Sequence, residues 1–166
     1  IPDDGVEENI IKSITGRVIS RDVSDYKVSL IDDNIERLGI SNIDVQVYNA
    51  LDKDDSLVGK ADIVIADLPC SGLGIMGRKP DIRYNISPEK ISDIIRLQRD
   101  ILEVVSMYVK PGGTLVYSTC TINRSENEEN ADWICTSHGF TRDGEYVQML
   151  PSPDKDNDGF FVARLL

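Results

Sequence analysis

The sequence has few of the residues that bind metals or form disulfide bonds. Its 166 residues include one histidine and three cysteines, Cys70, Cys120 and Cys135. An odd number of cysteines, none of them in a CxxC pair, argues against a disulfide framework, and the single histidine argues further against a zinc site. We therefore expect no metal, and we expect thiols that stay reduced, as they do in the cytoplasm, where we predict the protein acts.

Positive charge and long apolar runs are also scarce. Eighteen Lys and Arg stand against 29 Asp and Glu, which leaves a net charge of −11. Because nucleic-acid phosphates repel such a chain, any action on RNA requires a local basic patch or a further domain. No apolar run is long enough to span a membrane, and residues 1–9, IPDDGVEEN, lack a signal-peptide pattern, so we expect no membrane partner.

The residues that are present suit one folded domain over 1–166. Hydrophobic residues make up 40% of the chain and charged residues 28%, which provides enough apolar surface for a core. Apolar periodicity predicts strands over 17–21, 43–48, 61–67, 114–119 and 159–166, and helices over 6–14, 25–38, 123–137 and from 88 to shortly before Pro111. This alternation predicts an α/β fold with a mostly parallel sheet and helices on both of its faces.

Local signals mark several helix ends. Ser24 is a suitable N-cap and Gly39 a suitable C-cap for the helix between them. Pro111-Gly112-Gly113 is expected to stop the long helix that precedes it. Asn123 together with Glu126 forms a plausible capping box for the last helix.

In a parallel α/β sheet, ligands bind beyond the carboxyl ends of the strands, so the residues found there are candidate site residues. Segment 61–67, ADIVIAD, is almost continuously apolar, which is typical of a parallel strand buried on both faces, and Asp67, Pro69 and Cys70 lie at and after its end. Cys120 follows the next strand. If the two strands are neighbours, two thiols and a carboxylate line one pocket, which favours covalent chemistry. A structural turn with packed, inert thiols is the alternative.

Two further polar residues follow the earlier strands. Asp22 and Asn49 come directly after them. An acidic residue in such a position commonly binds ribose hydroxyls. The alternative is that such a residue lies at a helix N-terminus and interacts with the helix dipole. Spacing alone favours this second interpretation for Asp22.

The densest basic cluster in the chain follows the segment that contains Cys70. It consists of Arg78, Lys79 and Arg83. These side chains either contact RNA phosphates beside the pocket or belong to a solvated loop, and composition does not separate the two.

Three segments together resemble the RsmB/Sun family of RNA 5-methylcytosine methyltransferases. They are DLPCSGLGIMGRKPDIRY (67–84), LVYSTCTINRSENE (115–128) and DGFFVARL (158–165), and the resemblance extends from about residue 15 to the end. It implies a Rossmann-like methyltransferase sheet, S-adenosylmethionine as cofactor, and RNA, in particular ribosomal RNA, as substrate and partner.

The resemblance also implies roles for individual residues. Cys120, in the STC segment, matches the family's nucleophile, and Cys70, in the PCS segment, matches the thiol that assists release of the product. Asp67 matches the residue that contacts the target cytosine. An alternative enzyme class methylates exocyclic amines, but its sites need no second thiol, so Cys120 argues against it.

The cofactor site implied by the resemblance comprises Asp22, Asn49, Asp67 and Pro69. Asp22 matches the family's ribose-binding carboxylate. Asn49 falls where the family usually has an aspartate, although an amide can still hydrogen-bond to adenine.

One departure from the family concerns the first strand and the APGGK-like glycine loop that cradles the methionine part of the cofactor. Residues 1–9 contain no such loop. We therefore expect a partial catalytic domain that lacks this strand, and a chain that by itself binds S-adenosylmethionine weakly and is inactive. A non-catalytic α/β interaction module derived from a methyltransferase is the remaining alternative.

Overall fold

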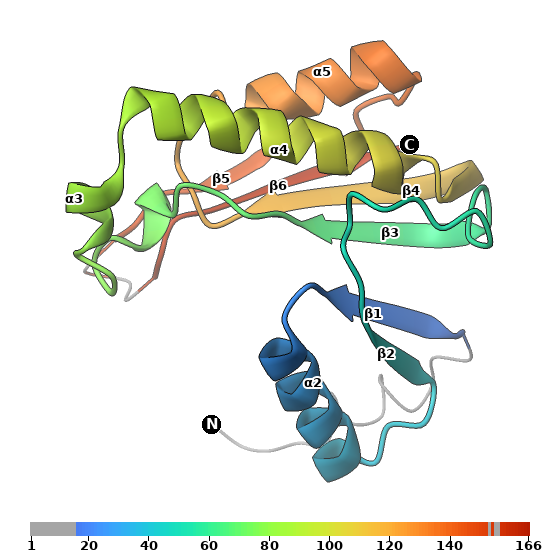
Figure 1. The fold of residues 1–166 in the computed structure, drawn as a ribbon. Coiled ribbons are helices and arrows are strands. Elements are labelled where there is room, and N and C mark those ends of the chain that lie inside the picture. Colours follow the sequence, from blue (N-terminus) through green and yellow to red (C-terminus); the bar gives the residue numbers. More distant parts are fainter. Residues whose placement is uncertain (1–15, 153, 155–156) are drawn as a thin grey trace. The chain divides into compact units, whose positions relative to one another are not determined.

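A computed structural model describes residues 16–152, 154 and 157–166, so the helix predicted over 6–14 lies outside the described residues. The chain divides into two compact units, Ile1–Asp52 and Lys53–Leu166 (Figure 1). Among the described residues, no helix is long and apolar enough to cross a membrane.

The smaller unit consists of a parallel strand pair and the helix that connects the two strands. Its elements are β1 (Val18–Asp22), α2 (Asp25–Leu38) and β2 (Ile43–Val47). The side chain of Ser24 accepts a hydrogen bond from the backbone N–H of Lys27, and Gly39 ends the helix with φ of 65°. These caps and all three elements confirm the boundaries predicted from the sequence to within one residue.

The larger unit contains a four-stranded sheet in the order β3-β4-β6-β5. Its elements are β3 (Ala61–Asp67), η1 (Leu73–Ile75), α3 (Ile82–Asn85), α4 (Pro88–Ser106), β4 (Val109–Thr119), α5 (Glu128–His138), β5 (Val147–Met149) and β6 (Phe160–Leu165). Strands β3 and β4 are parallel, whereas β6 runs antiparallel to both β4 and β5. The predicted α/β class is confirmed, but this sheet is mixed and not mostly parallel, because β6 reverses the chain direction. Helices α4 and α5 lie side by side on the sheet (Figure 1).

The core of the larger unit lies between these two helices and the sheet. Its fully buried apolar side chains include Leu102 of α4, Ile134 of α5, and Tyr117 and Phe161 of the sheet. The rings of Tyr117 and Phe161 meet edge to face with 5.9 Å between their centroids. This packing fixes β4, whose carboxyl end leads into Cys120, against β6.

The prediction that segment 61–67 is buried on both faces is wrong. Ala66 is 5% exposed, but Ile63 and Ile65, which point to the opposite face of β3, are 61% and 72% exposed. The contacts of β3 within the larger unit are with β4 and with α4, which covers one face only. A continuous apolar run therefore identified the strand correctly but not its surroundings.

The predicted helix stop at Pro111-Gly112-Gly113 is also wrong, because these residues belong to β4. Helix α4 already ends at Ser106, and the strand begins at Val109. The register between β3 and β4 shifts along this stretch, since Ala61 pairs with Val109 while Ile63 pairs with Thr114. An irregularity of this kind accommodates a proline, which cannot donate to the sheet.

The capping box predicted for the last helix is not formed. Helix α5 begins at Glu128, five residues after Asn123, and its N-cap residue is Asn127. The carboxylate of Glu126 instead accepts a hydrogen bond from the backbone N–H of Ser71, 55 positions earlier. The sequence signal failed because a tertiary contact takes the carboxylate that the local pattern assigned to the helix end.

Candidate active site

Parallel pairing brings the ends of β3 and β4 together, which confirms that the two strands are neighbours. Asp67 lies opposite Ser118 in the register. The Ser118 hydroxyl donates to Oδ1 of Asp67 at 3.0 Å, and the Leu68 N–H donates to the Ser118 carbonyl at 3.1 Å. The segments that carry Cys70 and Cys120 therefore leave the sheet at the same edge.

The two thiols meet just beyond this edge. The Sγ atoms of Cys70 and Cys120 lie 3.1 Å apart, within hydrogen-bond distance for sulfur, and either thiol can be the donor. Both residues are half-buried. The third cysteine, Cys135, lies in α5 and is not part of this pair.

Burial, together with the hydrogen bond and the charge of Cys120, raises the pKa of the Cys70 thiol to about 12. A thiol with such a pKa stays protonated at neutral pH. Cys70 is therefore suited to donate its S–H to Cys120, and not to act as a resting thiolate.

Buried polar side chains surround the turn that carries Cys70. Gln98, Glu126 and Asn130 are each fully buried, and Gln98 and Glu126 contact the backbone on either side of the thiol. The sequence patterns above do not predict this network. One signal for it was present, because Gln98 occupies the position between Ile94 and Leu102 on the apolar stripe of α4.

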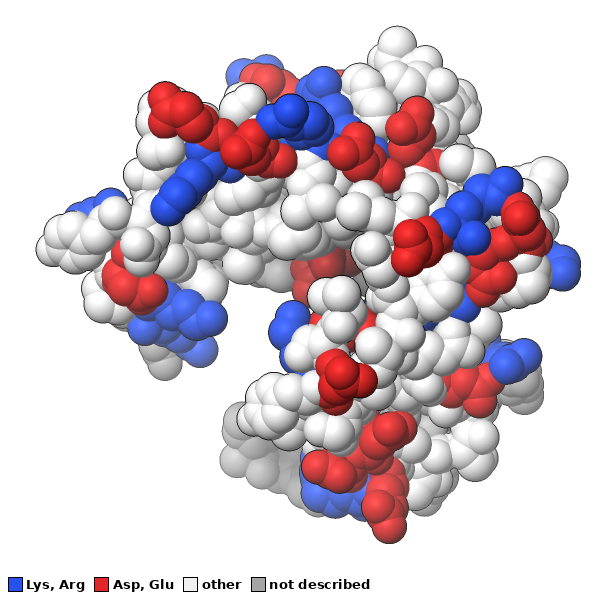
Figure 2. All heavy atoms as spheres, viewed as in Figure 1, with Lys and Arg blue, Asp and Glu red and all other residues white. Residues whose placement is uncertain are grey.

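The loop with the basic cluster is attached directly to the cysteine pair. The N–H of Gly74 in η1 donates to the carbonyl of Cys120 at 3.1 Å. Arg78 forms an ion pair with Asp158 at 3.0 Å, and Lys79 and Arg83 are exposed. Figure 2 shows Lys and Arg gathered at the end of the larger unit where η1 and α3 lie.

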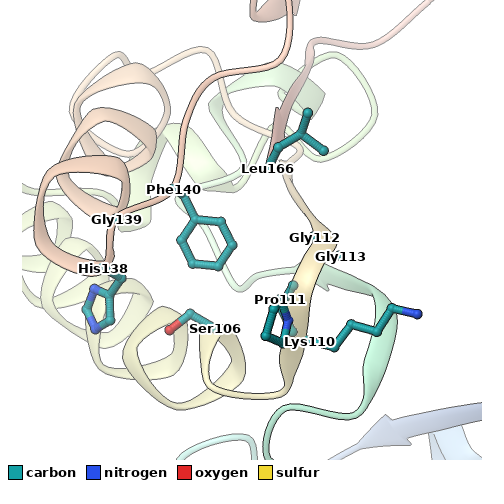
Figure 3. A pocket seen from close by; sticks show the side chains of 10 residues that line it. Ser106, Lys110, Pro111, Gly112, Gly113, His138, Gly139, Phe140 and Leu166 are labelled. Atoms are coloured by element: carbon teal, nitrogen blue, oxygen red, sulfur yellow. The ribbon is translucent and has the colours of Figure 1, made fainter.

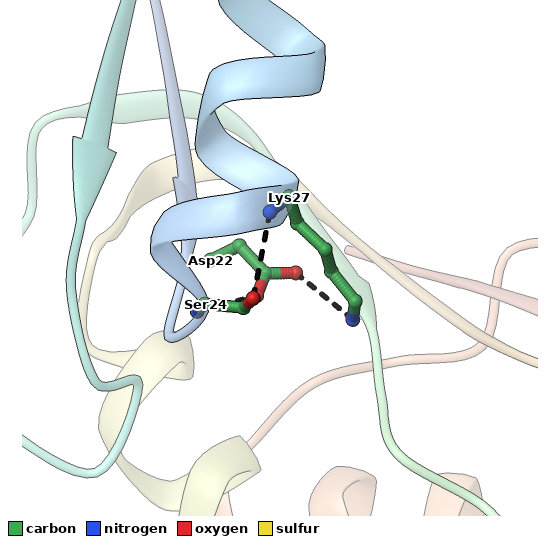
Figure 4. Close-up of polar contacts among 3 residues, drawn as sticks. All are labelled: Asp22, Ser24 and Lys27. Atoms are coloured by element: carbon green, nitrogen blue, oxygen red, sulfur yellow. Dashed lines mark hydrogen bonds and ion pairs between the residues drawn. The ribbon is translucent and has the colours of Figure 1, made fainter.

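The smaller unit brings the other two candidate residues together. Asp22 is the last residue of β1 and Asn49 follows the adjacent parallel strand β2, and the Tyr48 N–H donates to the Asp22 carbonyl at 3.0 Å. The Asp22 carboxylate accepts from the N–H of Ser24 at 2.8 Å and from Nζ of Lys27 at 3.2 Å (Figure 4). It lies at the N-terminus of α2, as the helix-dipole interpretation expected.

These contacts leave acceptor positions available on the Asp22 carboxylate, and the Asn49 side chain adds an amide oxygen at the neighbouring strand end. A carboxylate offers about four lone-pair positions, and the two hydrogen bonds to Asp22 use half of them. Asn49 is exposed, and its Oδ1 accepts from the Leu51 N–H at 3.1 Å. The acceptor oxygens at this edge therefore fit a ligand that donates from vicinal hydroxyls, such as a ribose.

Two cavities lie at opposite ends of β4. The smaller, of about 170 Å³, is lined by residues that include Cys70, Asp81, Asn85 and Lys90. The larger, of about 310 Å³, lies at the beginning of the strand, where the Phe140 ring stands between the helix ends and Pro111 (Figure 3). The described residues include no group of three or more His, Cys, Asp or Glu side chains arranged to hold a metal.

Comparison with known proteins identifies the family of the chain. The family model described as 16S rRNA methyltransferase RsmB/F matches residues 9–166. Ribosomal RNA small subunit methyltransferase F of Salmonella agona is 34% identical over 171 residues, which cover 90% of this chain and 35% of that protein. The probable ribosomal RNA small subunit methyltransferase B of Bacillus subtilis is 34% identical over 169 residues, which cover 90% and 37%.

The fold has a matching solved structure. NSun6 from Pyrococcus horikoshii, crystallised with SFG, aligns with a TM-score of 0.74 and 26% identity over 90% of this chain and 41% of that one. The chain thus spans about a third of the length of the curated relatives that it matches. The match over residues 9–166 shows that the chain belongs to the RsmB/F family of S-adenosylmethionine-dependent ribosomal RNA methyltransferases.

Proposed function

We propose that this chain carries catalytic residues of an enzyme that methylates carbon 5 of a cytosine in RNA, in particular ribosomal RNA. The observation that carries the proposal is the 3.1 Å contact between the sulfur atoms of Cys70 and Cys120. Methylation of an amine needs no thiol, whereas methylation at carbon 5 of a pyrimidine needs a nucleophile that activates the ring. A non-catalytic module has no use for two thiols held together at the edge of its sheet.

S-adenosylmethionine supplies the methyl group when it is bound. Asp22 would accept hydrogen bonds from its ribose hydroxyls, and Asn49 would contact the adenine. Asp67 and Pro69, at the end of β3, would border the methyl-donating end. The lone pairs that Asp22 retains at the end of β1 support this assignment.

Cys120 is the nucleophile in this proposal. Its thiolate adds to carbon 6 of an unpaired or flipped cytosine, and the ring then becomes enamine-like, so that carbon 5 can attack a methyl group. Asp67 faces nitrogen 3 and the amino group of the base, and the hydrogen bond from Ser118 orients its carboxylate. The Arg78, Lys79 and Arg83 loop beside the thiols would hold the RNA backbone.

Release of the product requires a second group. The proton on carbon 5 passes to a base, its electron pair forms the C5–C6 double bond, and the bond from carbon 6 to the Cys120 sulfur breaks. Because its pKa of about 12 keeps Cys70 protonated, this thiol can donate a hydrogen bond to the departing Cys120 thiolate, but it is not suited to take the proton itself. A water molecule positioned by Cys70 would take that proton.

Covalent trapping tests the two cysteine roles in the full-length protein. An RNA with 5-fluorocytosine at the target position traps the adduct, because the fluorine cannot leave as a proton does. We expect Cys120→Ala to abolish both turnover and trapping. We expect Cys70→Ala to lose turnover but to accumulate the adduct with ordinary RNA. Cys135→Ala, which changes the thiol outside the pair, should behave as wild type.

Two results would contradict these roles. Trapping by Cys120→Ala would show that another group attacks the base. Full turnover by Cys70→Ala would show that release proceeds without its thiol.

A further inference from the structure

The residues on either side of Cys70 are both held by buried polar side chains. Pro69 precedes the thiol, and its carbonyl accepts a hydrogen bond from Nε2 of Gln98 at 2.9 Å. Ser71 follows the thiol, and its backbone N–H donates to Oε2 of Glu126 at 2.8 Å. The stretch of backbone that carries Cys70 is therefore fixed at both ends, by a side chain of α4 and by one that precedes α5.

Glu126 is a fully buried carboxylate surrounded by neutral donors. Its Oε1 accepts from Nδ2 of Asn123 at 2.8 Å, and its Oε2, besides Ser71, lies 3.5 Å from Nε2 of Gln98. Burying a carboxylate is costly unless donors surround it, and an apolar side chain serves packing alone better. The hydrogen bonds of Glu126 therefore indicate a role in holding a particular geometry.

Gln98 extends this network to α5. Its Oε1 accepts from Nδ2 of Asn130, also fully buried, at 2.8 Å. Asn130 in turn accepts from Nε of Arg99 at 2.9 Å. Because a donor faces Oε1 and acceptors face Nε2, the orientation of the Gln98 amide is determined from both sides.

A third link joins the two cysteine segments directly. The hydroxyls of Ser71 and Thr121 lie 2.8 Å apart, and both residues are buried. Each of them immediately follows one of the cysteines. The pairing of β3 with β4 ends before either cysteine, so the 3.1 Å contact between the sulfur atoms depends on these side chains.

We propose that Glu126 and Gln98 are positioning residues that set the separation of Cys70 and Cys120 and, through it, the rate of product release. This inference rests on the proposed function, in which Cys70 assists the departure of Cys120. Hydrogen bonds weaken steeply with distance, and a displacement of about 1 Å can lower a rate by about a hundred-fold. Addition to the base depends on Cys120 and is affected less.

Formation of a disulfide measures the separation of the thiols without requiring methyl transfer. With diamide as oxidant, the two thiols lose two protons and two electrons and form an S–S bond, while diamide is reduced to its hydrazine. We expect Glu126→Gln in the full-length protein to slow this step about ten-fold or more, as followed by peptide mass spectrometry. Glu129→Gln, the same change at an exposed residue of α5, is the matched control and should keep the wild-type rate.

Kinetics test the link to release. We expect Glu126→Gln to lower kcat for RNA methylation about ten- to a hundred-fold, to leave KM for RNA near its wild-type value, and to let the ordinary RNA adduct accumulate. Gln98→Met has a similar side-chain length and removes the hydrogen bond to Pro69. It should give the same pattern, and it serves as the test if Glu126→Gln does not fold.

The outcomes separate this inference from the proposed function. Wild-type rates of disulfide formation in folded variants would overturn the inference, as would slow disulfide formation with unchanged kcat. Loss of the fold in both variants would also overturn it, because the network would then serve stability alone. Slow disulfide formation in the variants, together with a wild-type protein that does not methylate cytosine, would support the positioning role and contradict the proposed function.

Discussion

The backbone N–H of Gly159 donates to the carbonyl of Gly74 at 2.8 Å, and the two backbone segments approach too closely for a side chain on either residue. A Cβ built on Gly74 would lie 2.6 Å from the Gly159 carbonyl oxygen and 2.7 Å from that of Cys120. The loop that carries the basic cluster is thus held against the cysteine pair by contacts that only glycine permits.

We therefore expect Gly74→Ala to damage both stability and activity. The added methyl group meets backbone atoms that cannot rotate away, so we expect a loss of about 2–3 kcal/mol in the free energy of unfolding, measured with urea. Displacement of the Cys120 carbonyl should also lower turnover about ten-fold or more.

Gly77→Ala is the matched control for this prediction. A Cβ at Gly77 meets no atom within 4 Å, and its φ is not positive. Its effect on stability should stay within about 0.5 kcal/mol. Equal stability and turnover for Gly74→Ala and Gly77→Ala would show that the close contact yields at little cost.

The protonation of Cys70 gives a second prediction. Its pKa of about 12, against an ordinary thiol value of 9.0, leaves roughly a thousand-fold less thiolate at pH 8. Because iodoacetamide reacts with thiolates, Cys70 should resist alkylation at pH 8 and should react about ten-fold faster for each pH unit up to about 11. Peptide mass spectrometry after timed alkylation measures this, with the urea-unfolded protein as reference.

The same shift fixes the sign of a pH effect on stability. Between pH 9 and pH 12 the unfolded protein has lost the Cys70 proton while the folded protein keeps it. The unfolded state then binds fewer protons, so the contribution of this thiol, fully present below pH 9, falls as the pH rises through that window. Alkylation of native Cys70 that is half-maximal near pH 9 would contradict both expectations.

The sequence was sufficient where local patterns decide the structure. Ser24 and Gly39 delimit α2, and the order of strand ends correctly placed Asp67 beside the segment that leads to Cys120. The alternation of predicted strands and helices along the chain indicates that consecutive strands pair in parallel. The contact between Cys70 and Cys120 could therefore be anticipated.

Long-range contacts were beyond the same patterns. The local pattern predicts that Glu126 caps a helix, whereas the backbone N–H that donates to its carboxylate belongs to Ser71. The apolar run of segment 61–67 predicts burial on both faces, yet the exposure of Ile63 and Ile65 depends on which elements cover β3. Periodicity identifies a strand, but burial is decided by neighbours that are distant in sequence.

The basic loop gives a prediction for RNA binding. Lys79→Gln and Arg83→Gln in the full-length protein should each weaken binding to single-stranded RNA and reduce the slope of log affinity against log salt by about 0.7. Arg78→Gln should change the slope less, because Arg78 already pairs with Asp158. Lys110→Gln, the same charge change at the opposite end of β4, is the control. If all variants kept the wild-type slope, the prediction would be contradicted, and the cluster would belong to an ordinary solvated loop.

The last prediction decides between the two interpretations of Asp22. If its carboxylate accepts ribose hydroxyls, Asp22→Asn should weaken binding of S-adenosylhomocysteine to the full-length protein about ten- to a hundred-fold, measured by calorimetry. Asp22 also accepts from Ser24 and Lys27 at the start of α2, so the variant could act through the helix instead.

Ser24→Ala separates the two effects. It removes the side-chain cap on the Lys27 N–H at 3.4 Å and should cost about 1 kcal/mol of stability, but it leaves the Asp22 carboxylate in place. Wild-type affinity in Ser24→Ala, with a large loss in Asp22→Asn, assigns the carboxylate to the cofactor. A similar loss in both variants means that Asp22 serves the helix, because only the helix start is common to the two substitutions.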